Sequence, residues 1–271
     1  MVNPLGLLSA PQRCCLAGAL LLTATTAHAD PLSDRQQLAG DYFVGASVFL
    51  FERTVLTAFA PADSPEATLD AGAIVLAREN AGDESGSVAL QAILGWLNAW
   101  LSPDKKHAAE DPPGFSAERR ANLACLAYGA DPEVSVELAG HAGLGAEDRG
   151  ACIARYAEAR KKWIGWLQSF RKAGDGTVRA EPEGAPAEEE LVLRLVFAPT
   201  MDDADQAIAD AMRENGLFQV LTDDLNTSLA MPRPITALIT QCGEPKAFYN
   251  PDRGEAVLCY EMLGALLKTA P

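Results

Sequence analysis

A stretch of Gly, Pro, Ala and acidic residues at positions 174–190 divides this sequence into two unlike parts. It has no apolar periodicity, so we interpret it as a linker or surface loop. Before it, apolar residues recur at helical spacing. The predicted helices span residues 38–59, 67–78, 88–101, 116–128 and 147–170. Residues 30–173 are therefore predicted to form a helical half.

After the linker, residues 191–271 carry a different pattern. Residues 191–197 and 235–241 are typical of strands, and residues 203–226 predict one amphipathic helix between them. Residues 247–250 and 256–260 flank the turn sequence Pro251-Asp252-Arg253-Gly254, which favours a hairpin, and residues 261–267 predict a short helix. We therefore expect an α+β protein, with a small sheet and a hairpin in its C-terminal half, packed as one unit.

Residues 1–29 are interpreted as a signal peptide. Arg13 is the only charged residue before Asp30, and it precedes a short apolar run at residues 14–22. The run leads to Ala27-His28-Ala29, a small-x-small cleavage pattern, so cleavage is expected after Ala29. A lipoprotein signal ending at Cys14 is the alternative, although Arg13 fits a lipobox poorly. The mature protein is expected in the periplasm or outside the cell.

Four cysteines remain after signal removal, and an even number suits an oxidising compartment. They are Cys125, Cys152, Cys242 and Cys259. Three pairings are possible; each half holds two cysteines, so we favour pairing within each half. Four free thiols are an alternative. A four-cysteine zinc site is less favoured because no two cysteines have the close spacing that such sites use.

Charge argues against binding of nucleic acid, and hydropathy argues against a membrane span after the signal. The chain carries a net charge of −15, and no basic face with interleaved aromatic residues is present, which argues against nucleic acid. After the signal, we expect no segment with the eighteen or more apolar residues of a membrane span.

Three segments carry a resemblance to a known family. Residues 241–251 are similar to the signature Cys-Gly-Glu-x-Asn-Ala-Phe-Tyr-Asp-Pro, and residues 258–261 to a Cys-Tyr-Glu signature. Residues 118–132 resemble a segment Glu-x-Arg-x-x-Asn-x-x-Cys-x-x-Tyr-Gly-x-Asp-Pro. These are features of a bacterial domain family of unknown function described as "putative metallopeptidases". The signature residues here include Gly243, Glu244, Phe248, Tyr249, Tyr260 and Glu261.

The resemblance implies a zincin-like helical half with a catalytic zinc. In that family a His-Glu-x-x-His helix places two imidazoles one turn apart, with the Glu as general base. The corresponding residues here are Phe51-Glu52-Arg53-Thr54-Val55, so both histidine positions are apolar. Glu52 matches the general base. Glu66 and Asp70 match a Glu-x-x-x-Asp motif, in which Glu is the third ligand and Asp orients a ligand histidine.

Several interpretations of these residues stay open. Glu52, Glu66 and Asp70 could together hold a hard cation, although no calcium-type loop accompanies them. In the interpretation we favour, Phe51 and Val55 are ordinary core and Glu52 faces solvent or pairs with Arg53 or another cation. The mature chain's two histidines, His107 and His141, lie away from the motif positions.

We therefore expect an exported, metallopeptidase-like protein that is catalytically inactive, has no cofactor, and retains a cleft for a polypeptide or an envelope protein. An active peptidase with unidentified metal ligands is one alternative. A purely structural envelope protein, whose cleft is closed by Phe51 and Val55, is another. An open groove beside Glu52 would favour retained binding, and a filled one would favour the structural protein.

Overall fold

The computed structural model describes residues 34–79, 88–102, 111–172 and 191–270, with the side chains of residues 34–38 left out. The predicted signal peptide and linker, and His107, lie outside the described residues.

The first half is helical, as predicted. Its elements are α1 (Asp34–Leu56), η1 (Thr57–Phe59), α2 (Glu66–Glu79), α3 (Val88–Leu101), α4 (Ala117–Ala130), α5 (Val136–His141), α6 (Ala146–Leu167) and η2 (Gln168–Phe170). All five expected helices are confirmed. The sequence analysis missed α5, because a helix of six residues is too short to display an apolar period.

The second half contains a four-stranded mixed sheet, which confirms the α+β class. Its strands are β1 (Leu193–Phe197), β2 (Ile235–Thr240), β3 (Ala247–Asn250) and β4 (Glu255–Cys259), in the order β1-β2-β4-β3. β1 and β4 both run parallel to β2, whereas β3 and β4 form the predicted antiparallel hairpin. Gly254 ends the hairpin turn with φ 63°. A Cβ there would lie 2.6 Å from the carbonyl oxygen of Pro234, so the turn requires glycine.

Three helices accompany the sheet: α7 (Asp203–Asn215), α8 (Leu217–Ser228) and α9 (Tyr260–Thr269). The prediction of one continuous helix over residues 203–226 was wrong. Gly216 adopts a left-handed conformation, φ 69°, and ends α7 before α8 begins.

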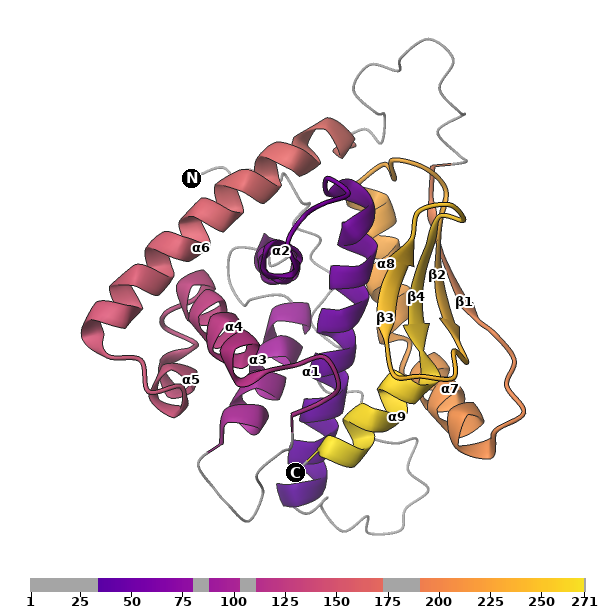
Figure 1. The fold of residues 1–271 in the computed structure, drawn as a ribbon, viewed down its shortest axis with the longest axis horizontal. Coiled ribbons are helices and arrows are strands. Elements are labelled where there is room, and N and C mark those ends of the chain that lie inside the picture. The colour runs from indigo at the N-terminus through magenta and orange to yellow at the C-terminus, as the bar shows by residue number, and fades with distance from the viewer. Residues whose placement is uncertain (1–33, 80–87, 103–110, 173–190, 271) are drawn as a thin grey trace, which may run out of the picture.

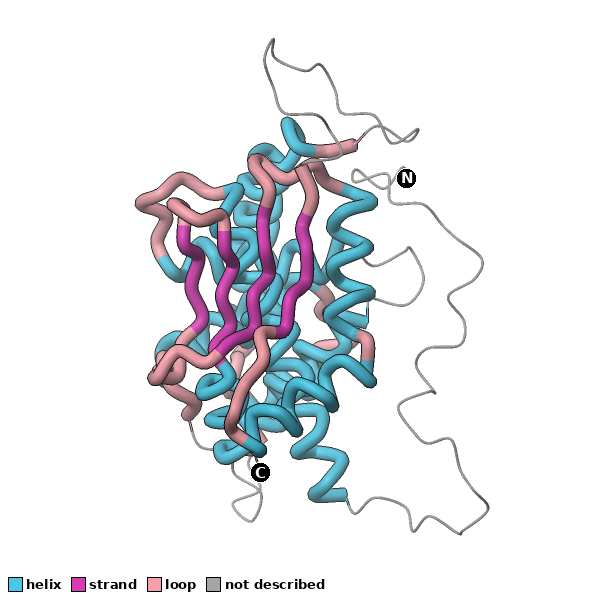
Figure 2. The backbone as a smooth tube through the Cα atoms, turned by 90° about the vertical axis from the view of Figure 1, so that its right-hand side faces the viewer, coloured by secondary structure: helices cyan, strands magenta, loops and turns pink. Residues whose placement is uncertain are grey.

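Helix α1 lies in the middle of the molecule, with α2 to α4 on one side and α8 and the sheet on the other (Figure 1). A single hydrophobic core includes residues from both halves, which confirms that they pack as one unit. The closest helix contact is between α1 and α3, where a Cβ on Gly45 would lie 2.0 Å from the carbonyl oxygen of Ala92. Figure 2 shows the helices behind one face of the sheet.

Helix α1 is also long and apolar enough to span a membrane. The segment Ala39–Phe59 reaches a mean hydropathy of 1.3. Our expectation that no segment after the signal is long and apolar enough to span a membrane was therefore wrong. In the structure, 72% of the apolar window is buried inside the protein, as in the central helix of a folded core.

Two disulfides confirm the favoured pairing. Cys125–Cys152 joins α4 to α6, and Cys242–Cys259 joins the loop after β2 to the end of β4. Gly129 lies one turn after Cys125, and a Cβ there would lie 2.3 Å from the carbonyl oxygen of Cys152. The glycine lets α4 and α6 approach each other beside the disulfide.

Candidate functional site

The two positions that we predicted to match the zinc histidines are buried core residues. Phe51 is 3% exposed and Val55 is fully buried. The Phe51 ring stacks on Phe218 of α8, with the ring centroids 4.7 Å apart and the planes 28° from parallel. Such a pair contributes about 0.5–1.5 kcal/mol beyond its buried area. This side of α1 is therefore packed against α8, and neither residue offers an atom that could bind zinc.

Glu52 is buried as well, at 1% exposure. Its Oε2 has no hydrogen-bond partner among the described residues. Burial raises the pKa of the Glu52 carboxyl well above its ordinary value, and the negative charge of Asp224 on α8 raises this pKa further. Our expectation that Glu52 faces solvent or pairs with a cation was wrong. The environment favours the protonated, neutral carboxyl, which avoids burying an uncompensated charge.

Glu66 and Asp70, the two residues of the Glu-x-x-x-Asp motif, are bound by arginines. The Asp70 carboxylate accepts hydrogen bonds from Nε of Arg53 at 2.7 Å and from Nε and NH2 of Arg119, both at 2.8 Å. Glu66 Oε1 lies 3.0 Å from a terminal nitrogen of each arginine. We call these four residues the arginine cluster. Each carboxylate bonds both guanidinium groups, so the charges of the cluster compensate one another.

The arginine cluster is buried to different depths. The side chains of Arg53 and Arg119 are 12% and 11% exposed and that of Asp70 is 4% exposed, whereas that of Glu66 is 58% exposed. Arg119 is held further by the carbonyl of Gly114 at 2.7 Å and by the Phe115 ring, whose centroid lies 4.1 Å from its Cζ. Asp70 is thus the inner anchor of the cluster and Glu66 its solvent-exposed edge.

The arginine cluster and Phe51 approach α1 from different sides. Successive residues of an α-helix are about 100° apart around its axis, so positions 51 and 53 are separated by about 200°. Phe51 contacts α8, whereas Arg53 contacts Glu66 and Asp70 of α2. Figure 1 shows α2 and α8 on opposite sides of α1. The carboxylates of α2 therefore do not lie against the face that carries Phe51.

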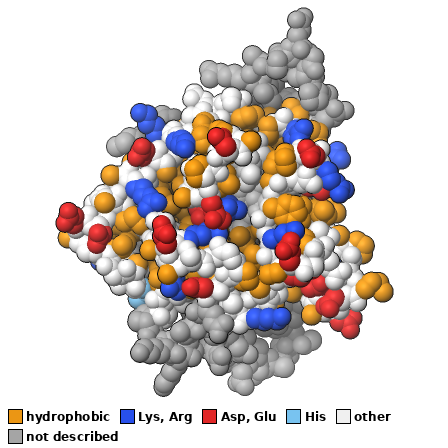
Figure 3. Space-filling model, viewed as in Figure 1, with side chains coloured by type: hydrophobic (Ala, Val, Ile, Leu, Met, Phe, Trp, Pro, Cys, Tyr) orange, Lys and Arg blue, Asp and Glu red, His pale blue; other side chains and the backbone are white. Residues whose placement is uncertain are grey.

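A pocket of about 270 Å³ opens beside the arginine cluster. It lies between α2 and α4, and Glu66, Asp70, Arg119, Asn122 and Arg155 contribute to its wall. Its lining does not include the three candidate residues of α1. On the face shown in Figure 3, acidic and basic side chains are interspersed rather than gathered by sign.

The C-terminal signature residues build a compact loop. The Glu261 carboxylate, in the first turn of α9, accepts hydrogen bonds from the backbone N–H groups of Cys242 at 3.0 Å and Gly243 at 2.6 Å. Partial burial acts to raise the pKa of Glu261. Backbone hydrogen bonds, including those from Gly243 and Cys242, and the charge of Lys246 outweigh that effect and lower it below its ordinary value. Glu261 is thus an ionised acceptor that holds the loop after β2.

The other signature residues divide between core and surface. Tyr260 is fully buried, and its hydroxyl donates to the carbonyl of Ala198 at 3.0 Å. Tyr249 packs against the core. Phe248 is 37% exposed, with Lys246 over its ring, and Glu244 bonds Lys246 at 2.6 Å. These contacts give the signature residues structural roles in the sheet and its loops.

The structure offers no conventional metal centre among the residues it describes. His141, at the end of α5, lies 3.9 Å from Glu137 and away from the candidate residues of α1 and α2. Within the described ranges, one group has three potential ligand atoms within 4.8 Å of one another: Cys242, Cys259 and Glu261. Both sulfurs of this group are joined in a disulfide, so neither is a thiolate ligand.

Comparison with known protein families identifies one that the C-terminal half of this chain resembles. Residues 197–270 match the model of a family described as "Putative metallopeptidase". The match covers this C-terminal segment of the chain. The family match confirms the resemblance noted in the sequence and contains both the Cys-Gly-Glu and the Cys-Tyr-Glu signatures. No curated protein and no solved structure matches the chain.

The matched residues of the metallopeptidase family begin near the end of β1 and continue into α9. Helices α1 and α2 lie before them, so the correspondence of Glu52, Glu66 and Asp70 to the family's zinc motifs rests on their spacing. The family suggests zinc in its active members. Phe51 and Val55 do not fit that ion, because their hydrocarbon side chains have no atom that could bind it.

Sequence reasoning missed the arginine cluster. Arg119 lies 49 residues from Asp70 in the chain, so no local pattern connects them. The available signal was Arg53, a cation placed directly after Glu52 in the apolar C-terminal half of α1. We had considered it as a partner for Glu52, whereas it points to α2.

Proposed function

We propose that this protein is an exported relative of the metallopeptidase family that has lost zinc-dependent hydrolysis and serves as a structural protein of the bacterial envelope. The observation that carries this proposal is the burial of Phe51 and Val55 at the two histidine positions, with Phe51 stacked on Phe218. A zinc site needs three protein ligands and a position for water. The side of α1 that would supply two of these ligands is packed with the hydrocarbon side chains of Phe51 and Val55.

The state of Glu52 supports the loss of catalysis. A general base must accept a proton from water, which requires an ionised carboxylate within hydrogen-bond reach of that water. Glu52 is 1% exposed, and its pKa is raised by burial, so its environment opposes both conditions. Glu66 cannot compensate, because it pairs through Oε1 with Arg53 and Arg119 and lies on α2, away from the face of α1 that carries Phe51.

Export has separate support. Two disulfides in a chain of this size suit an oxidising compartment, and the N-terminal sequence has the pattern of a signal peptide. The face beside Glu52 is filled and offers no cleft for a polypeptide, which favours a structural protein over retained binding. The same observation favours a structural contribution by Phe51 and Val55 rather than a retained substrate cleft.

The test is metal content and hydrolysis of the mature, oxidised protein. We expect far less than one equivalent of zinc after purification without chelators, and no chelator-sensitive cleavage of casein. A Glu52→Gln variant is the matched control, because it removes the predicted general base and should change neither result. One equivalent of zinc, together with cleavage that a chelator and Glu52→Gln both abolish, would overturn the proposal.

A further inference from the structure

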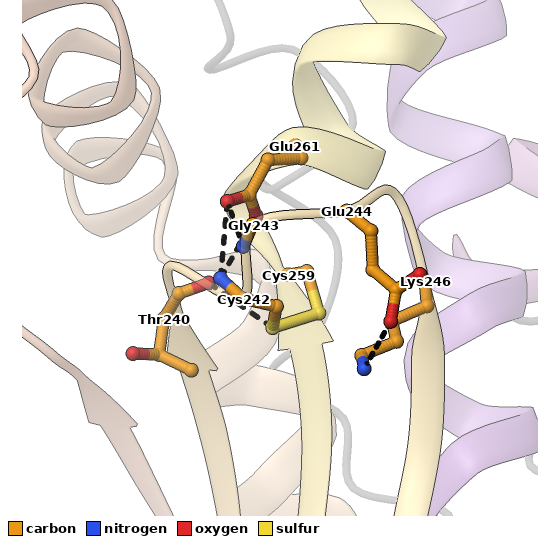
Figure 4. Close-up of a disulfide and its surroundings, with 7 residues drawn as sticks. All are labelled: Thr240, Cys242, Gly243, Glu244, Lys246, Cys259 and Glu261. Atoms are coloured by element: carbon orange, nitrogen blue, oxygen red, sulfur yellow. Dashed lines mark hydrogen bonds and ion pairs between the residues drawn. A yellow bond between two sulfur atoms is a disulfide. The ribbon is translucent and has the colours of Figure 1, made fainter.

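The Cys242–Cys259 disulfide and Glu261 bring three potential metal ligands together at one edge of the sheet. The two sulfurs and a carboxylate oxygen all lie within 4.8 Å of one another. Cys242 follows β2, Cys259 ends β4 and Glu261 lies in the first turn of α9. Figure 4 shows the Glu261 carboxylate directed toward the loop that carries Cys242, beside the bonded sulfurs. Since β2 and β4 are parallel, their carboxyl ends meet here.

These three groups match the chemistry of a soft divalent metal once the disulfide is opened. Thiolate and carboxylate oxygen are both zinc ligands, at about 2.3 Å and about 2.0–2.2 Å. Three protein ligands leave a fourth tetrahedral position for water. Each sulfur now has the other as its bonded partner, at 2.05 Å, so the oxidised protein cannot offer them as thiolates.

The surrounding backbone already orients the carboxylate. Glu261 is held by the N–H groups of Cys242 and Gly243, which leaves lone pairs on its oxygens for a metal. Gly243 has φ 81°, a conformation that other residues rarely adopt, and this turns the chain back toward α9. Cys242 and Glu261 are half-buried while Cys259 is buried, so the site is fixed on one side and reachable on the other.

We propose that Cys242, Cys259 and Glu261 form a redox-gated site for zinc or a similar soft divalent cation. A dithiol reductant opens it: the reductant loses two electrons and two protons and becomes a disulfide, while the Cys242–Cys259 bond breaks and each sulfur gains a proton. Zinc then displaces both thiol protons, which pass to solvent, and binds the two thiolates and the Glu261 carboxylate. Bound zinc opposes reoxidation because it occupies both sulfurs.

This site is separate from the α1 positions that match the family's zinc motif. Its ligands come from β2, β4 and α9, and none comes from α1 or α2. It therefore does not depend on the proposed loss of hydrolysis, and the oxidised protein used to test that loss has this site closed.

The experiment compares zinc binding by the mature protein before and after anaerobic reduction with a phosphine reductant that is then removed. Cobalt serves as the spectroscopic probe and zinc as its competitor. We expect one equivalent of cobalt in the reduced protein, with a sulfur-to-metal charge-transfer band, and none in the oxidised protein. Glu261→Gln should weaken binding by about tenfold or more, since even partners of ligands contribute 10–100-fold.

Two double variants make the test specific. In the reduced state neither the wild type nor Cys242→Ser with Cys259→Ser has this disulfide, so they differ in ligand chemistry alone. The band should disappear in that variant and persist in Cys125→Ser with Cys152→Ser, which removes the other cysteine pair. Circular dichroism checks that each reduced protein is folded. Absence of the band in folded, reduced wild type, or an equal band after loss of Cys242 and Cys259, would overturn the proposal.

Discussion

Glu52 of α1 and Asp70 of α2 are buried carboxyl groups with opposite environments. Asp70 and Glu52 are 3% and 1% exposed, so both have lost their water. Asp70 is bonded by two arginines, whereas Oε2 of Glu52 has no hydrogen-bond partner among the described residues. Ion pairing keeps a buried carboxylate charged, and without it protonation is favoured. Similar burial thus accompanies an ion cluster on one side of α1 and, on the other, a carboxyl group whose environment favours the neutral form.

The largest effect is expected from Asp70→Asn. This change leaves Arg53 and Arg119 largely buried without their main carboxylate partner. Breaking a buried pair in this way costs about 3–5 kcal/mol of unfolding free energy. Urea denaturation would measure it. A loss below about 1 kcal/mol would mean that the arginine cluster is not a stabilising centre and would remove the contrast with Glu52.

The double change Phe51→His with Val55→His tests the other side of α1. It breaks the Phe51–Phe218 stack and buries polar atoms, so we expect a loss of about 2–4 kcal/mol. We also expect no zinc binding, because Glu66 and Asp70 are bonded to Arg53 rather than facing position 51. Calorimetric zinc titration of the oxidised protein would check this. Tight binding that depends on Glu66 would show that α2 does reach this face.

A smaller effect, opposite in sign, is expected from Glu52→Gln. The folded protein raises the pKa of Glu52, so this carboxyl binds a proton in the native state at pH values where the unfolded chain has released it. Its contribution to stability is fully present below the unfolded pKa of about 4.5 and is lost as pH rises toward the folded pKa. Glutamine cannot ionise. The variant should therefore gain stability relative to wild type between pH 4.5 and 7.

Thermal unfolding of both proteins over that range measures the difference. A Glu52→Asp variant shows whether shape rather than ionisation is responsible, because it keeps the acid but shortens it. Parallel curves for wild type and Glu52→Gln would mean that Glu52 ionises normally in the folded protein.

The smallest effect is expected from Glu66→Gln. Its side chain is 58% exposed, and exposed ion pairs typically contribute about 0–1 kcal/mol. Asp70 remains to hold both arginines. Urea denaturation beside Asp70→Asn gives the comparison directly. Equal losses for the two variants would contradict the division into an inner anchor and an exposed edge.

The sequence predicted what local patterns control. Apolar spacing located the helices, alternation located the strands, and the distribution of cysteines between the two halves suggested both disulfides. The break between α7 and α8 was missed, because a single Gly216 inside an amphipathic pattern does not by itself reveal a left-handed conformation. Local rules describe periodicity well and single backbone reversals poorly.

The candidate site was harder to predict, because its chemistry depends on tertiary contacts. Phe51 and Val55 could be recognised as core from their residue types, and the structure agrees. The buried environment of Glu52 could not be predicted from the sequence, because it depends on Asp224 and on the packing of α8. The arginine cluster depends on Arg119, from a helix that contacts α2 only in the fold. The spacing of the predicted zinc motifs therefore indicated which residues to examine, while tertiary contacts determined the environment of each.

The central claim is that the face of α1 beside Glu52 is closed and that Glu52 is held as a neutral acid. The most direct measurement is the titration of the Glu52 side-chain carboxyl by ¹³C NMR, assigned by comparison with Glu52→Gln. We predict that this resonance stays protonated well above pH 4.5, while the Glu261 resonance titrates below its ordinary range. A Glu52 carboxyl that titrates near pH 4.5, as a solvated glutamate does, would show that the face is open and would contradict this account.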